Sequence, residues 1–112
     1  MKQYTLLIGG ERVATLNHAE VRNPSTGAVV GLMPLASEAD LDRAVAAAGS
    51  AFERWSKTTD AERAAACRAI AEKLSDHADE VARLLTLEQG KPLSGLGSRF
   101  ELGGALAWTR HT

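Results

Sequence analysis

Near its N-terminus the chain places apolar residues at alternate positions, which is the period of a β-strand. Tyr4, Leu6 and Ile8 occupy alternate positions before the pair Gly9-Gly10, and Val13 resumes the apolar pattern after it. Glycine pairs favour the tight turns that join two antiparallel strands. We therefore predict that the chain opens with a β-hairpin.

A second hairpin is predicted around the run Asn23-Pro24-Ser25-Thr26-Gly27. Proline presets φ, asparagine can bond its own backbone, and glycine supplies a positive φ, so this run is a dense turn signal. The return arm extends from Ala28 to Met33. We expect it to stop at Pro34, which cannot donate to a sheet ladder and therefore marks a sheet edge or a strand end.

Helical periodicity replaces the alternation from about Ser37 onward. Ser37 followed by Asp40 is a capping box, which predicts a helix start. Apolar residues then recur at i, i+3, i+4 and i+7: Leu41, Ala44, Val45, Ala48, Ala51, Phe52 and Trp55. The pattern predicts one face buried as far as Trp55.

A second capping box, Thr59 to Glu62, starts the next apolar stripe: Cys67, Ile70, Ala71, Leu74, Ala78, Val81, Ala82 and Leu85. The run Ser75–Asp79 contains another possible cap, which leaves open one helix or two that meet at a bend. Gly90-Lys91-Pro92 then predicts a helix end, because glycine favours the C′ position and proline cannot continue the ladder.

The segment from Ser94 to Thr112 predicts a further helix, with Leu96, Phe100, Gly103 and Ala107 on one face. Glycines at 103 and 104 weaken it by about 0.5 to 1 kcal/mol each and indicate close approach of another backbone. The predicted fold class is α+β, with a β-hairpin region over residues 1–36 and a helical region of three or four helices over 37–112.

Composition restricts the classes of partner. The chain has 112 residues and 13 Lys plus Arg against 14 Asp plus Glu, so it lacks the basic field needed to hold nucleic acid or an anionic membrane. Its apolar runs are too short for a membrane span or a signal peptide. The single cysteine, Cys67, forms no internal disulfide, and a cytoplasmic location fits these features best.

Alanine is abundant between Ala36 and Ala82, and it contributes little buried area per residue at about 25 cal/mol per Å². Aromatic residues make up only 4% of the chain. The helices are therefore expected to pack on something larger. An isolated chain would expose apolar faces and is expected to be a homo-oligomer, marginally stable or partly rearranged.

No catalytic, cofactor-binding or metal-binding residue can be assigned from these patterns. Cys67 lies within a helical apolar stripe, where a buried and inert thiol is the usual state. His18, His77 and His111 lack metal-ligand spacing. No G-x-S-x-G segment supports a serine nucleophile.

The glycines near residue 95 also fail as a nucleotide loop, because Phe100 and Leu85 stand where the dinucleotide fingerprint and the P-loop require glycine. We expect a helix terminator and a flexible connection there. The clustered carboxylates fall in first helical turns or on solvated faces: Asp40, Asp42, Asp60, Glu62, Asp76, Asp79, Glu80 and Glu88.

Four linked motifs resemble the N-terminal region of the aldehyde dehydrogenase superfamily. They are Val21–Gly31, Ala44–Ala48 with Phe52 and Trp55, Ala61-Glu62-Arg63, and Leu87–Leu93, and Glu101–Trp108 resembles the family's next helix. The resemblance covers essentially the whole chain.

The resemblance implies a parent several-fold longer, with an α/β fold, that oxidises aldehydes to carboxylic acids with NAD or NADP. In the family a cysteine forms a thiohemiacetal and a glutamate acts as base. The Rossmann-like core and the catalytic domain, which would carry those groups, are absent here. Cys67 does not match the catalytic cysteine. Some members hold a monovalent cation for which Val21, Arg22 and Glu88 would be the nearest positions, and we assign no metal to them.

Two hypotheses follow. In the first, the chain is an N-terminal fragment of such a dehydrogenase, inactive alone and structural in role, whose abrupt end at Thr112 is an interruption. In the second, it is a non-enzymatic, α-rich module from a truncated reading frame, which associates with itself or with a partner through its apolar helix faces.

Overall fold

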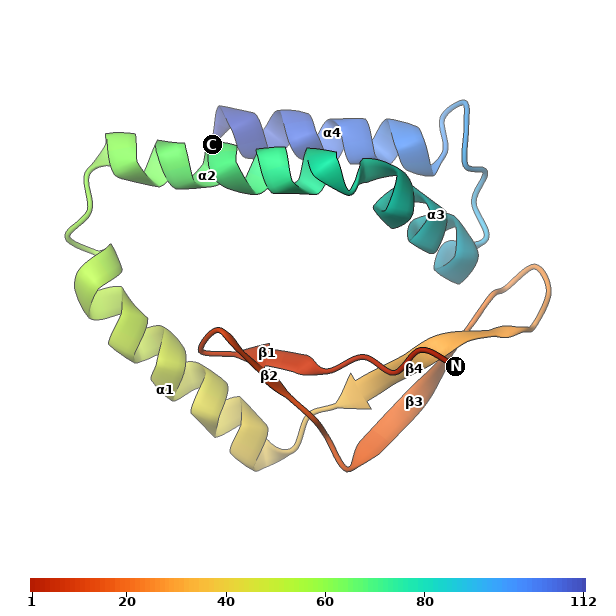
Figure 1. Ribbon diagram of the computed structural model, residues 1–112, viewed down its shortest axis with the longest axis horizontal. Coiled ribbons are helices and arrows are strands. Elements are labelled where there is room, and N and C mark those ends of the chain that lie inside the picture. The colour runs from red at the N-terminus through yellow and green to blue at the C-terminus, as the bar shows by residue number, and fades with distance from the viewer. The chain divides into compact units, whose positions relative to one another are not determined.

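A computed structural model describes residues 1–112, which form four strands followed by four helices (Figure 1). The α+β class predicted from the sequence is confirmed. The chain divides into two compact units. Unit 1 comprises Met1–Arg22 and Thr26–Lys57, and unit 2 comprises Asn23–Ser25 and Thr58–Thr112.

Unit 1 contains both hairpins. Strands β1 (Leu6–Ile8) and β2 (Glu11–Val13) pair antiparallel, with Leu6 opposite Val13. Gly9 and Gly10 connect them with φ of 60° and 87°, the left-handed values that a two-residue hairpin turn requires. The first predicted hairpin is confirmed.

The second hairpin pairs β3 (Asn17–Arg22) with β4 (Val29–Leu35). The predicted stop at Pro34 is wrong, because β4 runs through Pro34, which lies opposite His18. Leu32 exchanges hydrogen bonds of 3.0 and 3.1 Å with Lys2 and Tyr4 on the other edge of β4. Backbone direction repeats every two residues, so the nitrogen of Pro34 also faces away from β3 and the ladder needs no donor from it.

Helix α1 (Glu38–Trp55) completes unit 1 and starts at the predicted cap. The Ser37 side chain accepts from the backbone of Asp40, whose carboxylate accepts in turn from the Ser37 backbone. The predicted buried face is wrong, since no residue of α1 is buried. The helix contacts β1 mainly, and its alanines are small enough for Ala47 to lie 3.6 Å from the Cβ position of Gly9.

Unit 2 is a layer of three helices, α2 (Asp60–Asp76), α3 (Ala78–Gln89) and α4 (Ser98–His111). Thr59 caps α2 through the predicted box with Glu62. Of the two alternatives for this stretch, the structure has two helices, which meet at His77. Helix α4 packs against both α2 and α3 and lies alongside α2 (Figure 1).

The predicted close approach of another backbone to Gly103 and Gly104 is wrong, since a Cβ at either position would meet nothing within 4 Å. Helix α4 differs from its prediction in two further respects. It begins at Ser98 rather than near Ser94, because residues 92–97 form a tight turn in which Ser98 N–H donates to Pro92 over 2.8 Å. Its packed face carries Ser98 and Leu102, whereas Phe100, on the face predicted to pack, is 62% exposed. The apolar residues of α4 surround the helix, so periodicity alone did not select the correct face.

The buried core is small. Its apolar members are Ala71, Ala82 and Leu102, and Ser98 is the buried polar residue. Two of these three apolar side chains are single methyl groups, and each removes little area from water. None of the helices has the length and hydrophobicity to cross a bilayer.

Candidate functional site

The residues with nucleophilic or metal-binding chemistry are dispersed over several elements. Cys67 lies in α2 and is half-buried rather than fully buried as predicted. His18 lies in β3, where its Nε2 is 2.7 Å from the Gln3 amide nitrogen. His77 lies at the α2–α3 junction and His111 in the last turn of α4. The cysteine and the histidines therefore lie apart, and the structure has no cluster of three or more His, Cys, Asp or Glu side chains that could hold a metal ion.

The carboxylates that the sequence placed at helix starts do stabilise those starts. The backbone N–H and the hydroxyl of Ser37, followed by the Arg43 guanidinium, lower the pKa of Asp40 to about 2. The backbone and hydroxyl of Thr59 lower the pKa of Glu62 for the same reason, since they donate to the charged form. These depressed pKa values reflect helix capping and carry no catalytic implication.

Asp79 connects two helices of unit 2. Its carboxylate accepts from Arg99 of α4 at 2.8 Å and from Arg83 of α3 at 2.7 Å. Both contacts lower the pKa of Asp79, with Arg99 the larger cause. The predicted solvated position is confirmed, but the charge also ties α4 to the start of α3.

A buried hydroxyl pair supports the same contact between α3 and α4. Ser98 has no exposed surface, and its Oγ lies 2.8 Å from Thr86 Oγ1. Sequence reasoning missed this pair, because serine and threonine at helix positions give no distinct pattern. The two hydroxyls satisfy each other across the α3–α4 contact, so we assign the pair a structural role.

The glycines near residue 95 serve backbone packing. A Cβ on Gly97 would lie 1.8 Å from the carbonyl oxygen of Pro92, so only glycine fits the turn. Gly95 adopts φ of 65° in the same turn. Gly90 has φ of 72° and caps α3, as predicted. The glycine spacing therefore reflects the backbone requirements of this turn.

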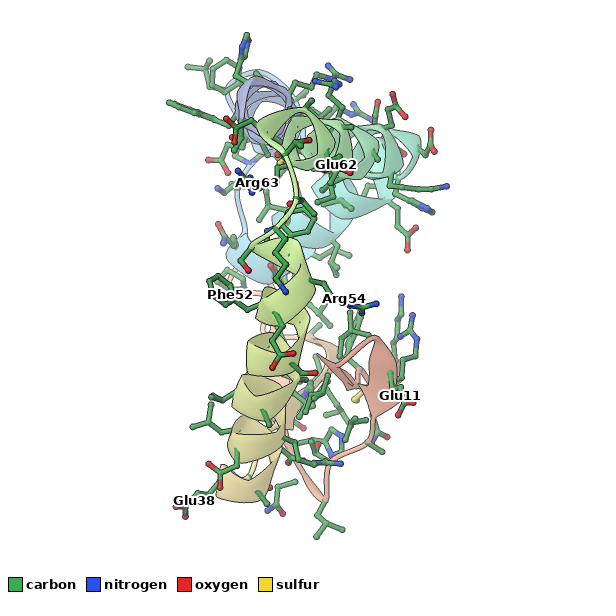
Figure 2. The ribbon with its side chains drawn as sticks, turned by 90° about the vertical axis from the view of Figure 1, so that its left-hand side faces the viewer. Glu11, Glu38, Phe52, Arg54, Glu62 and Arg63 are labelled. Atoms are coloured by element: carbon green, nitrogen blue, oxygen red, sulfur yellow. The ribbon has the colours of Figure 1, made fainter.

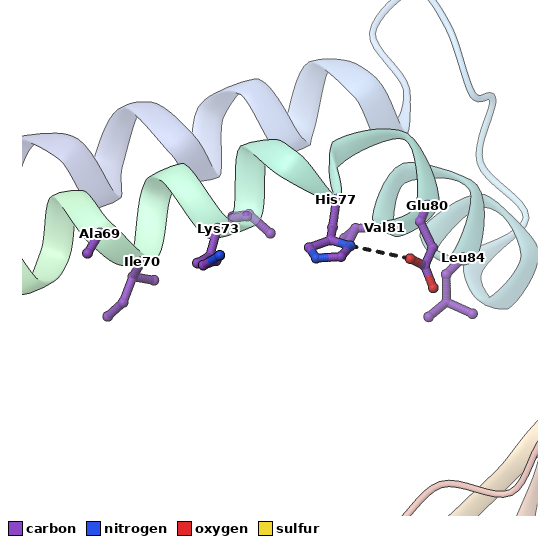
Figure 3. Close-up of a pocket in the computed structure, with 8 residues that line it drawn as sticks. Ala69, Ile70, Lys73, His77, Glu80, Val81 and Leu84 are labelled. Carbon is purple, nitrogen blue, oxygen red and sulfur yellow. Dashed lines mark ion pairs between the residues drawn. The ribbon is translucent and has the colours of Figure 1, made fainter.

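The distinctive surface of unit 2 is a groove of about 650 Å³ along α2 and α3. Its residues point away from α4, as Figure 3 shows. We call it the α2–α3 groove, and it is lined by Ala69, Ile70, Lys73, Leu74, His77, Glu80, Val81 and Leu84. His77 Nδ1 and Glu80 Oε2 lie 3.6 Å apart at its edge.

The apolar stripe predicted from the sequence does not form a single buried face. Some of its residues are buried and others line the α2–α3 groove. Ala71 and Ala82 are fully buried, whereas Ile70, part of the same predicted stripe, is 60% exposed in the groove. Leu84 was not included in the stripe and lines the groove. Ile70 is thus left at the surface, Leu74, Val81 and Leu84 are half-buried, and the two alanines are fully buried.

Further apolar side chains are exposed on the other helices. On α4, Phe100 is 62% and Trp108 is 79% exposed. In unit 1, Leu41, Val45 and Phe52 of α1 are also mostly exposed. Figure 2 shows Phe52 projecting from the side of α1 opposite the hairpin that carries Glu11.

Comparison with known proteins gives one consistent result. The model of the aldehyde dehydrogenase family matches residues 12–110. A probable aldehyde dehydrogenase of Pseudomonas sp is 45% identical over 105 residues, which are 94% of this chain and 21% of that protein. A 3,6-anhydro-alpha-L-galactose dehydrogenase of Streptomyces coelicolor is 39% identical over 103 residues, 90% of this chain and 20% of that protein.

Solved structures give the same result. A 3,6-anhydro-L-galactose dehydrogenase in complex with NAP matches with a TM-score of 0.89 and 28% identity, over 98% of this chain and 23% of the other. An NAD-dependent benzaldehyde dehydrogenase from Corynebacterium glutamicum matches with a TM-score of 0.84 and 33% identity, over 94% and 23%. The chain spans about a fifth of the length of the curated relatives it matches.

Proposed function

The chain belongs to the aldehyde dehydrogenase family, and we propose that it is the N-terminal segment of an NAD- or NADP-dependent enzyme that oxidises an aldehyde to a carboxylic acid. The family match over residues 12–110 carries this proposal. Relatives with this fold bind NAD or NAP, as their structures' names state.

Within that enzyme, the proposed role of residues 1–112 is structural. Two observations support this role: backbone packing accounts for the glycine at residue 97, and helix caps and ion pairs account for the depressed carboxylate pKa values. The segment would shape and support the cofactor-binding part of the enzyme. Residues 1–112 alone would be inactive.

A chimera tests the proposal. Residues 1–112 replace the matching segment of the Corynebacterium glutamicum benzaldehyde dehydrogenase, and NAD reduction with benzaldehyde is measured. We expect activity in the chimera and none in the same enzyme with the segment deleted. A folded chimera without activity would contradict the proposal. Calorimetric titration of the 112-residue chain with NAD should show no binding, and measurable binding would refute the structural role.

The second candidate is an α-rich association module without enzymatic activity. Its support is the exposed apolar surface on α1 and α4 and along the α2–α3 groove. It predicts a defined oligomer of the 112-residue chain, or a stoichiometric complex with an unrelated protein. Sedimentation of the purified chain distinguishes it from a marginally stable monomer.

A further inference from the structure

Residues 2–4, which we call the N-terminal arm, cover the outer edge of β4, the edge that does not pair with β3. Leu32 N–H donates to the carbonyl of Lys2 over 3.0 Å, and Tyr4 N–H donates to the carbonyl of Leu32 over 3.1 Å. The arm runs parallel to β4, with Gln3 opposite Leu32. Figure 1 shows the N-terminus beside β4. The arm therefore extends the β3–β4 sheet by one short segment.

Side chains hold the arm on both faces of this sheet. A Cβ on Gly31 would lie 3.0 Å from Tyr4 Cε2, so the glycine makes room for the tyrosine ring. Lys2 Nζ lies 5.0 Å from the centre of the same ring, which is a cation–π contact. Gln3 points to the opposite face, where its amide nitrogen is 2.7 Å from His18 Nε2. These contacts are specific to the residues of the arm.

Without the arm, β4 would present an edge suited to pairing with another strand. The strand has no charged residue, and all its residues except Gly31 and Pro34 are large and apolar. An unpaired edge of such a strand is a template for a strand of another molecule, and native sheets blunt it with charges or proline. Pro34 has its nitrogen on the outer edge and removes one donor there. The donor and acceptor of Leu32 are covered by the arm alone.

We propose that the outer edge of β4 is a strand-binding surface for a second copy of this chain, and that the N-terminal arm is a strap that blocks it. In the dimer, each Leu32 donates to and accepts from the Leu32 of the other copy, as in an antiparallel hydrogen-bonded pair. These two bonds replace the two that Leu32 makes with the arm. The proposal does not depend on the proposed function.

A second copy matches this edge for two reasons. The strand lacks the charged side chains that would select a partner of opposite charge, and a two-fold axis joins the edge to an identical apolar strand. The arm belongs to the same chain, so its effective concentration is on the order of millimolar. At micromolar protein concentration the arm therefore occupies the edge, and its release permits two copies to pair.

Hydrogen exchange of the Leu32 amide tests the strap and the pairing together, because this amide is bonded to the arm in the monomer and to the second copy in the dimer. Tyr4→Pro removes the ring over Gly31 and the N–H that donates to Leu32. At micromolar concentration, we expect exchange at Leu32 at least about tenfold faster than in the unmodified chain. At millimolar concentration the exchange should slow again, and sedimentation should give the mass of a dimer.

Leu7→Ala is the matched control. Leu7 lies opposite Arg12 in the other hairpin and is 73% exposed, so this change removes apolar surface near the arm and leaves the β4 edge intact. Its exchange at Leu32 and its mass should equal those of the unmodified chain at every concentration. Adding Pro34→Val to Tyr4→Pro restores a donor on the outer edge and should strengthen dimerisation by at least about threefold.

Three results would overturn the proposal. Slow exchange at Leu32 in Tyr4→Pro at micromolar concentration would show that Tyr4 does not hold the arm on the edge. Fast exchange at every concentration would show that the freed edge does not bind a second copy. A dimeric mass with Leu32 still exchanging fast would assign the association to another surface, such as the exposed apolar helix faces.

Discussion

Gly90 lies directly against Pro24, and a Cβ on residue 90 would be 2.7 Å from Pro24 Cγ and 3.0 Å from Ser25 Oγ. The φ of Gly90 is 72°, a left-handed value that L residues adopt at a cost. The glycine that ends α3 therefore also makes room for the Asn-Pro turn. Two motifs that are far apart in the sequence are joined at this contact.

We expect Gly90→Ala to lower the free energy of unfolding by about 2 to 5 kcal/mol. The left-handed backbone accounts for about 1 to 2 kcal/mol, and the overlap with Pro24 adds about 1 to 3 kcal/mol. Urea unfolding followed by circular dichroism measures the loss. Gly27→Ala is the control, because Gly27 has φ of 74° with nothing within 4 Å of its Cβ position. Equal losses at both positions would disprove the role of the Pro24 contact.

Two glycines near and within α4 should respond in opposite directions. A Cβ on Gly104 meets nothing within 4 Å, so Gly104→Ala should raise the free energy of unfolding by about 0.5 to 1 kcal/mol through helix propensity. Gly97→Ala would place its Cβ 1.8 Å from the Pro92 oxygen and should unfold the 92–97 turn. Thermal unfolding of both variants measures the direction of each change in stability. A Gly104→Ala variant less stable than the unmodified chain would contradict the finding that the Cβ position of Gly104 is unobstructed.

The buried hydroxyl pair of unit 2 should couple α3 to α4. Ser98→Ala and Thr86→Val are each expected to lower the free energy of unfolding by about 1 to 2 kcal/mol, because a polar group loses its partner. The two hydroxyls are 2.8 Å apart, so the double variant should lose less than the sum. A double-mutant cycle measures the coupling, and strict additivity would show that the bond contributes nothing.

The start of α1 should weaken in acid. The pKa of Asp40 falls from 3.8 to about 2 in the folded chain, mainly because the backbone and hydroxyl of Ser37 donate to its carboxylate. A lowered folded pKa gives stability that is present above about pH 4 and is lost as the pH falls toward about 2. Helix content measured against pH should decline in that window.

Asp40→Asn should reduce this decline by the part that comes from α1, since the amide does not titrate, and leave the parts from Glu62 and Asp79, whose pKa values are also lowered. Asp42→Asn removes the same charge from the same turn without changing the contact to Ser37, and should retain the decline. An unchanged profile for Asp40→Asn would show that other carboxylates cause the acid transition.

Local sequence determined the classes of the elements, the starts of α1 and α2 and the end of α3. Ser37 with Asp40 and Thr59 with Glu62 form the predicted capping boxes, and Gly9-Gly10 and Gly90 take the left-handed values that their positions indicated. Each of these features depends on residues at most four positions apart. Family membership also followed from sequence, because the motifs combine at fixed spacing.

Tertiary structure decided which apolar face each helix uses. On α4, both the Phe100 face and the Leu102 face have helical spacing, and contact with α2 and α3 selected Leu102. Pro34 stays within β4 because its nitrogen faces the edge opposite β3. The packed face of α4 and the position of Pro34 both depend on which element lies alongside. The periodicity of a single element carries no information about its neighbours, so it could not predict them. The apolar face of α1 shows the same principle, since its pattern predicts burial and this chain supplies no element that buries it.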